Sequence, residues 1–179
     1  MTGDRNTAAC HYARRLTSRP MLIRERIDLR NRGEWSRISF ERCIESNLGL
    51  NVRRRQARRC ISSTLRPYAK MQWETESDAV IALTFSDPQM WTMLDSLTER
   101  LAALADRPLT PRELLIALPI TNKERLRWTK DGRLARSGAV TIKRGHLISV
   151  PTYSVAVVEQ IRADLTVIEA WREIDRLPP

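Results

Sequence analysis

The chain has 179 residues, 42% of them hydrophobic, which is enough for one sizeable domain or two small ones with packed cores. Its 31 lysines and arginines against 21 acidic residues give a formal net charge of +10, which indicates a polyanionic partner. No apolar run is long enough to cross a membrane, and residues 1–20 lack the apolar core of a secretory signal. We therefore expect a cytoplasmic protein, associated with the nucleoid if it is bacterial.

Residues 1–20 contain four arginines and one acid, and we interpret them as a basic flexible arm, with an organellar transit peptide as the alternative. The three cysteines form no C-x-x-C pair, and their odd number argues for a reducing compartment. A zinc site would have to bring Cys10, His11, Cys43 and Cys60 together from unrelated spacings. No metal or cofactor is therefore predicted.

Charge is distributed in blocks along the chain. Residues 1–70 carry 17 basic and 6 acidic side chains, whereas residues 71–107 carry 2 and 7. Residues 108–150 are basic again, with 9 against 3, and residues 151–179 are slightly acidic. Two separate basic blocks indicate two contacts with one polyanion, or one contact and an arm. The acidic 71–107 segment is a candidate docking surface for a protein partner.

Residues 21–107 are expected to form a helical or α+β domain with at least one short strand. Apolar residues at 38, 40, 44 and 48 predict a helix over 38–48, followed by a turn at Leu48–Asn51 and a second helix over 53–65 that ends before Pro67. The apolar run 80–85 predicts a strand. Asp87 and Pro88 then predict the start of an amphipathic helix. Its apolar stripe consists of Met90, Leu94, Leu97, Leu101 and Leu104.

The helix over 53–65 is unusually basic. Its first seven positions hold Arg53, Arg54, Arg55, Arg58 and Arg59. Five arginines so close together repel one another without an anion, so we predict contact with a nucleic acid or another polyanion. A second helix-turn-helix over 38–65, with Leu48–Asn51 as its turn, is an alternative interpretation.

Residues 108–153 carry two helix-capping signals. In the first, Thr110 and Glu113 have the spacing of a capping box, and Pro111 occupies the first helical position. Pro119 ends that helix. Thr121 and Glu124 form a second capping box immediately afterwards. Two helices joined by so short a turn are typical of a helix-turn-helix.

A basic hairpin follows the second of these helices. Gly132 is a left-handed helix stop, and the apolar runs 139–142 and 147–150 predict two strands joined by the basic turn 143–146. Trp128 is expected in the core. The residues predicted to contact DNA here are Asn122, Lys123, Arg125, Arg127, Lys130, Arg133, Arg136, Lys143, Arg144 and His146.

Residues 109–161 resemble the excisionase and mercuric-resistance-regulator superfamily of winged helix-turn-helix DNA binders. The resemblance is carried by Leu114-Leu115, by Ile120-Thr121 at the turn, by Trp128-x-x-Asp131-Gly132-Arg133-Leu134, and by the ending Ile148-Ser149-Val150-Pro151. It implies that the second helix enters the major groove and that the hairpin flanks it. Two positions depart from the pattern. Pro119 stands where a glycine is usual, and Arg125 stands where an apolar residue packs inward, so the register of the second helix is open by one residue.

Residues 154–174 are expected to form one long helix. Val158, Ile161, Leu165 and Ile168 form an apolar stripe that either pairs two subunits or folds back on its own domain. In the superfamily, a helix at this place often pairs subunits.

The sequence thus predicts a mainly α protein with a small β-hairpin wing. Its predicted function is sequence-specific binding of double-stranded DNA as a transcriptional regulator. An accessory factor of a mobile element, acting in excision, replication, segregation or DNA packaging, has the same site chemistry. An interaction protein that docks a larger machine is the third alternative. No phosphate loop, nucleophile elbow or zinc-protease motif occurs, so no enzyme is predicted.

Overall fold

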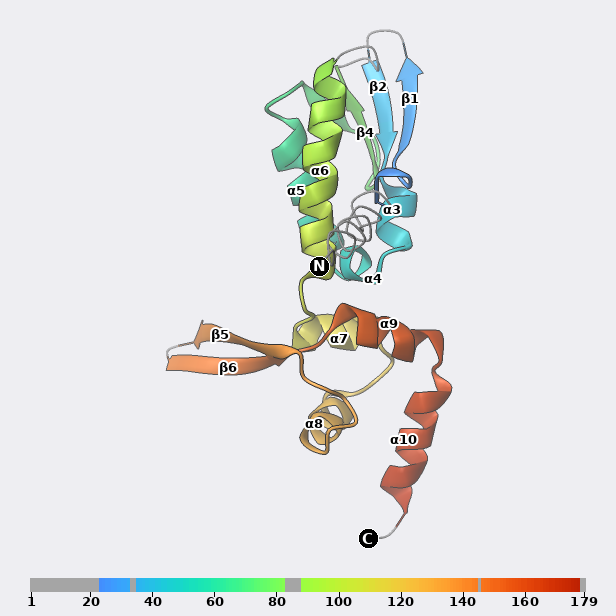
Figure 1. Ribbon diagram of the computed structural model, residues 1–179, viewed down its shortest axis with the longest axis vertical. Coiled ribbons are helices and arrows are strands. Elements are labelled where there is room, and N and C mark those ends of the chain that lie inside the picture. Colours follow the sequence, from blue (N-terminus) through green and yellow to red (C-terminus); the bar gives the residue numbers. More distant parts are fainter. Residues whose placement is uncertain (1–22, 33–34, 83–87, 145, 178–179) are drawn as a thin grey trace, which may run out of the picture. The chain divides into compact units, whose positions relative to one another are not determined.

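The computed structural model describes residues 23–32, 35–82, 88–144 and 146–177. They form eight helices, a four-stranded antiparallel sheet and a C-terminal β-hairpin followed by helices, so the protein is mixed α/β (Figure 1). The chain divides into two compact units, Met1–Ala105 and Asp106–Pro179. The predicted arm and the Asp87 helix cap lie outside the described residues. No helix in the described ranges has the length and apolar character needed to span a bilayer.

The first unit is built on a sheet that has more strands than the sequence predicted. The strands are β1 (Asp28–Arg32), β2 (Trp35–Ser39), β3 (Met71–Trp73) and β4 (Asp78–Ile81), in the spatial order β1-β2-β4-β3. Only the strand predicted at 80–85 was anticipated. The observed strand β4 begins two residues earlier and ends at Ile81, and residues 83–85 lie outside the described residues. The others are five residues long or shorter, so their alternation extends over too few positions to be distinguished from loop sequence.

Two helices, α5 (Arg54–Leu65) and α6 (Pro88–Asp106), cover one face of this sheet (Figure 1). Ser36 and Ile38 of β2 are fully buried beneath them, whereas Arg37 points to the opposite face. The α6 stripe is confirmed: Met90, Leu94, Leu97 and Leu101 are buried, and Leu104 is partly buried. The helix predicted over 53–65 is also confirmed.

The helix predicted over 38–48 is wrong. Ile38 belongs to β2, and two short helices follow, α3 (Glu41–Glu45) and α4 (Leu48–Asn51). Asn47 separates them because its side chain accepts a hydrogen bond from the Leu50 N–H and caps a new helix.

The turn predicted at Leu48–Asn51 is α4 itself, so the alternative helix-turn-helix over 38–65 is also wrong. Gly49 has a packing role there, because a Cβ at this position would lie 2.1 Å from the carbonyl oxygen of Ala105. The backbone of α4 approaches the end of α6 closer than any side chain allows.

The second unit follows the predicted order. Its elements are α7 (Pro111–Ala117), α8 (Asn122–Lys130), β5 (Gly138–Arg144), β6 (His146–Thr152), α9 (Val155–Ala163) and α10 (Thr166–Arg176). Both capping boxes form: the Glu113 N–H donates to Thr110 Oγ1 at 3.4 Å, and the Glu124 N–H donates to Thr121 Oγ1 at 3.2 Å. Gly132 has φ 86°, as predicted for a left-handed stop.

The single long helix predicted over 154–174 is wrong, because the chain breaks between α9 and α10. Asp164 leaves the helical region and its carboxylate accepts hydrogen bonds from the N–H and the hydroxyl of Thr166. Val158, Ile161 and Ile168 are buried inside the unit, whereas Leu165 is 45% exposed. Most of the stripe therefore packs within its own unit, and pairing of two subunits through it stays a prediction.

Candidate nucleic-acid interface

The exposed side of α8 is the centre of the candidate site. The helix advances 100° per residue, so Asn122, Leu126 and Lys130 line up along it and Lys123 lies beside them. All four side chains are exposed to solvent. The inward side consists of Arg125, Trp128 and Thr129, which are buried. The helix thus presents an amide, two ammonium groups and an isobutyl group on one continuous arc.

Arg125 lies on the buried side of α8. Its guanidinium donates to the Tyr153 hydroxyl and to Asn122 Oδ1, each at 3.0 Å, and its backbone carbonyl accepts from the Thr129 hydroxyl. Only 7% of Arg125 is exposed, so it supports the fold. It lies outside the exposed arc of α8, although the sequence placed it among the predicted DNA contacts. This placement also resolves the register of α8: Arg125 points inward and Leu126 points out.

The contact with Arg125 orients the amide of Asn122. Since the guanidinium can only donate, the atom it meets is the amide oxygen. The NH2 group of Asn122 then remains on the solvent side, where it can donate to an acceptor on a base edge. A buried arginine thus positions a residue of the exposed arc.

Asp175 of α10 holds the C-terminal part of α8 and the loop that follows it. Its carboxylate accepts from Trp128 Nε1 at 3.0 Å and forms ion pairs with Arg127 at 2.9 Å and Arg133 at 2.6 Å. The Arg133 hydrogen bond, followed by those of Trp128 and Arg127, lowers the pKa of Asp175 to about 2. The indoles of Trp128 and Trp171 also pack edge to face, with ring centroids 4.9 Å apart. Helix α10 is therefore folded back onto α8.

Arg127 and Arg133 differ in how accessible their guanidinium groups are to a ligand. Arg127 is 60% exposed despite its ion pair, so it stays accessible at the border of the arc. Arg133 also donates to Asp131 and to the Trp171 carbonyl, and it is 21% exposed. It holds the loop after α8 in place and is a poor candidate for a phosphate contact.

Glu124 connects the second capping box to α10. Its carboxylate accepts from the Thr121 N–H at 2.6 Å and from Arg172 Nε at 2.7 Å. Arg172 also donates to the Pro119 carbonyl in the turn between α7 and α8. The Arg172 hydrogen bond is the main reason that the pKa of Glu124 falls to about 2. One arginine of α10 thus fixes the turn and the start of α8 together.

The hairpin extends away from the helices of the second unit (Figure 1). Its register pairs Gly138 with Thr152 and Arg144 with His146. The predicted contacts Lys143, Arg144 and His146 fall on the strand ends beside the turn, where their backbone is described and their side chains lie outside the description.

A groove separates the hairpin from α8. It has a cavity volume of about 420 Å³, and Leu126, Arg136, Val150 and Pro151 are among its lining residues. Arg136 is exposed at its border. The groove therefore adds a cation between the exposed arc of α8 and the hairpin.

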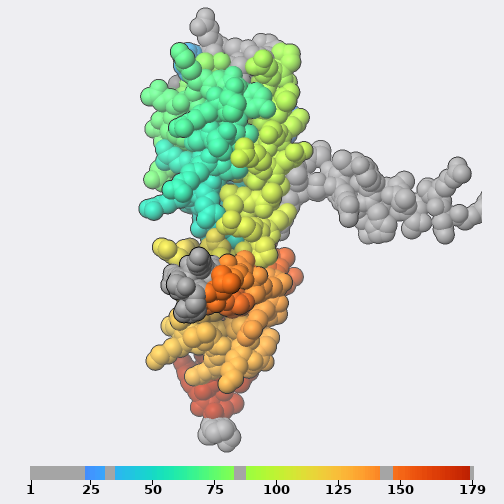
Figure 2. Space-filling model, turned by 90° about the vertical axis from the view of Figure 1, so that its left-hand side faces the viewer, coloured from blue at the N-terminus to red at the C-terminus, as the bar shows by residue number. Residues whose placement is uncertain are grey.

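The arginines of the first unit have different environments. Arg53 is only 2% exposed and donates to the Leu104 carbonyl at 3.0 Å, so it stabilises the end of α6. Arg54 pairs with Glu45 on the surface. Arg58 lies over the Trp73 ring, 4.6 Å from its centroid. Arg55 and Arg59 are exposed one turn apart on α5, whose surface lies beside α6 in Figure 2.

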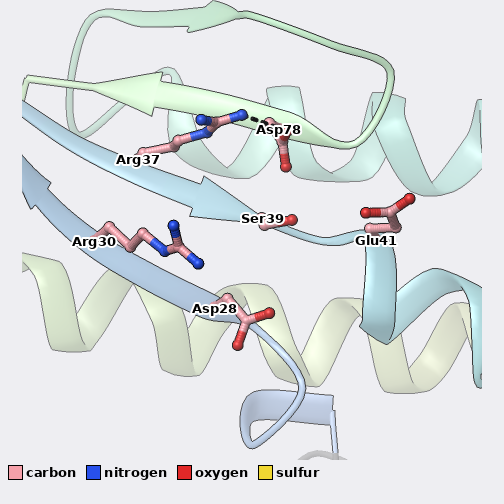
Figure 3. Close-up of a pocket in the computed structure, with 6 residues that line it drawn as sticks. All are labelled: Asp28, Arg30, Arg37, Ser39, Glu41 and Asp78. Carbon is pink, nitrogen blue, oxygen red and sulfur yellow. Dashed lines mark hydrogen bonds and ion pairs between the residues drawn. The ribbon is translucent and has the colours of Figure 1, made fainter.

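The open face of the sheet carries a polar pocket that does not suit a polyanion (Figure 3). It is lined by Asp28, Arg30, Arg37, Ser39, Glu41 and Asp78. Three carboxylates outnumber two guanidiniums, and Arg37 is already paired with Asp78 at 2.7 Å and with Glu74 at 3.2 Å. The Ser39 and Arg37 hydrogen bonds lower the pKa of Asp78, so its negative charge persists.

Three carboxylates of the acidic 71–107 segment form ion pairs inside the first unit. Glu74 and Asp78 share Arg37, and Asp95 of α6 pairs with Arg24. Several of its carboxylates are thus neutralised within their own unit. Docking of a protein partner through this segment stays a prediction.

Two features of the site were missed from the sequence. Residues two positions apart lie on nearly opposite sides of a helix. Because Trp128 points inward, Leu126 has to point outward, and the helical spacing alone predicts this. The role of Asp175 had no sequence signal, because its partners lie more than 40 positions away.

Comparison of the chain with protein-family models, with curated proteins and with solved structures finds no match in any of the three. The function is accordingly inferred from the residues of the site.

Proposed function

We propose that this chain is a sequence-specific double-stranded DNA-binding protein that acts as a transcriptional regulator, with its second unit working as a winged helix-turn-helix. One observation carries the proposal: the exposed arc of α8 combines Asn122 with Lys123 and Lys130 on a helix that is capped at its start and fixed from behind. Amide and ammonium donors on a rigid helix match the acceptor-rich edges of bases in the major groove.

In the proposed complex, the hairpin makes a second contact with DNA. Two cations at its tip suit the phosphates that border the groove occupied by α8. Arg136 lies in the groove between α8 and the hairpin, where it suits a phosphate as well. In this arrangement α8 supplies sequence specificity, and the hairpin adds affinity that is the same for every DNA sequence.

Selection of binding sites from a random duplex pool tests this proposal. The full-length protein is expected to enrich one motif, and excess random duplex is expected to compete at least a thousandfold less well than that motif. Enrichment of no motif, together with equal competition by random duplex, would show a non-specific architectural binder.

The position of the enriched motif in the source genome distinguishes a regulator from an accessory factor. Motifs that overlap promoters, protected in footprints, are expected for a regulator. Motifs confined to attachment sites or replication origins would assign the same surface to a mobile-element accessory factor. The neighbouring genes provide an independent check.

A further inference from the structure

Leu126 is the one apolar side chain on the exposed arc of α8. It lies midway between Asn122 and Lys130, at the centre of the arc, and it is 54% exposed. Trp128 and Leu134 supply the buried apolar contacts in this part of the chain, at 0% and 1% exposure. Most of the Leu126 side chain is therefore left in solvent, in a helix whose other outward residues are polar.

The position of Leu126 between Asn122 and Lys130, with Lys123 beside it, restricts what can cover it. An apolar protein surface would bury the neighbouring ammonium groups of Lys123 and Lys130 without partners, at a high desolvation cost. A duplex has no such conflict, because its phosphates and base acceptors satisfy the cations. In the major groove, the C5 methyl of thymine is the apolar group that a base presents at its edge.

We propose that Leu126 is a specificity-determining residue that contacts a thymine methyl group in the major groove. Asn122 and Lys130, one helical turn to either side of it, contact the base edges or phosphates next to that thymine. This inference rests on the proposed function, and it adds the chemical feature of the target that the centre of α8 recognises.

Uracil scanning of the selected duplex tests the inference, because replacing thymine by uracil removes only the methyl group. Wild-type protein is expected to bind about 3–5-fold more weakly when uracil occupies one or two particular positions, the loss that corresponds to burying one methyl group. Leu126→Ala should bind the thymine duplex more weakly and should be indifferent to uracil at those positions.

Ile174→Ala is the matched control. Ile174 is an aliphatic residue of nearly the same exposure, 56%, on α10 and outside the exposed arc of α8. This variant should retain the wild-type affinity and the wild-type response to uracil. Because Leu126 and Ile174 are both exposed, both variants should melt within a few degrees of the wild type.

Cytosine methylation provides a second test at the same base pair, since 5-methylcytosine and thymine both carry a methyl group at C5. With C·G in place of the sensitive T·A pair, methylation should restore about 3–5-fold of affinity for the wild type and none for Leu126→Ala.

The outcomes separate this inference from the function on which it rests. A selected motif whose binding is indifferent to uracil at every thymine would overturn the inference and leave the proposed function standing. The inference also falls if Leu126→Ala loses as much affinity on uracil substitution as the wild type does. Failure to select any motif would overturn the proposed function and, with it, the role of Leu126.

Discussion

Arg125 and Leu126 are neighbours whose environments reverse the usual rule, because the charged residue is buried and the apolar one is exposed. The reversal follows from the rotation of α8, which places positions 125, 128 and 129 against the rest of the unit. Burial of Arg125 is tolerated because Tyr153 and Asn122 accept its hydrogen bonds. The exposed Leu126 is the side chain for which we propose a contact with a thymine methyl group.

Arg125→Ala is expected to act on stability. Loss of a buried charged donor and of its packing should lower the free energy of unfolding by about 2–3 kcal/mol, measured by urea denaturation. The slope of DNA affinity against salt should stay the same, because no phosphate contact is removed. A variant with wild-type stability and a reduced salt slope would place Arg125 on the DNA.

Gly49→Ala tests the close approach of α4 to α6. An alanine in a helix normally stabilises by up to about 1 kcal/mol relative to glycine. Here the added Cβ meets the Ala105 carbonyl, so we expect a loss of about 1–3 kcal/mol in chemical denaturation. Gly138→Ala, whose Cβ would lie 3.4 Å from Thr152 Oγ1, is the control and should change stability by less than about 0.5 kcal/mol. Equal effects would refute the close approach.

At the scale of elements, α10 fixes the position and orientation of α8 within the second unit. Asp175 and Arg172 fix α8 at its end and at its start, and Trp171 packs on Trp128 between them. These contacts stabilise the change of direction between α9 and α10, which Figure 1 shows.

Low pH should weaken the contacts between α8 and α10. Glu124 and Asp175 both have a pKa of about 2 in the folded protein, below their ordinary values of 4.5 and 3.8. Groups with a lowered pKa stabilise the fold above their ordinary pKa, and that stabilisation is lost as the pH falls towards the folded value. The melting temperature should therefore decline as the pH is lowered from about 5 towards 2.

Asp175→Asn provides the control for this decline. The variant should melt lower than the wild type at pH 7 and should lose less on acidification, because one of the carboxyl groups whose pKa is lowered in the folded protein is gone. Parallel declines of the two proteins in thermal melts between pH 7 and 3 would mean that Asp175 does not contribute to the effect.

Elements with local signals were predictable from the sequence, and elements fixed by distant contacts were not. The capping boxes at Thr110 and Thr121, the stop at Gly132 and the α6 stripe depend on residues within a few positions of one another. The short strands β1 and β3 are stabilised by cross-strand pairing, and the position of α10 depends on its contacts with α8. The site followed the same division: Lys123 and Lys130 are exposed as expected, whereas the buried positions of Arg53 and Arg125 depend on Leu104 and Tyr153.

At the scale of the whole molecule, the net charge of +10 should dominate non-specific affinity. If about six phosphates are neutralised, affinity for random duplex should fall roughly a thousandfold between 50 and 200 mM salt. Replacing Arg55 and Arg59 together should lower the salt slope by about two units if α5 touches the same duplex. An unchanged slope would confine the DNA contact to the second unit.

The central claim, that α8 reads bases while the hairpin binds phosphates, is tested most directly by the affinity ratio between the selected site and random duplex. Lys123→Ala or Asn122→Ala should cost about 1–3 kcal/mol on the selected site and less on random duplex, so the ratio should fall. Lys143→Ala or Arg144→Ala should weaken both duplexes alike, lower the salt slope by about one unit each and leave the ratio unchanged. If substitutions in α8 weaken both duplexes equally, α8 does not read sequence and the account is contradicted.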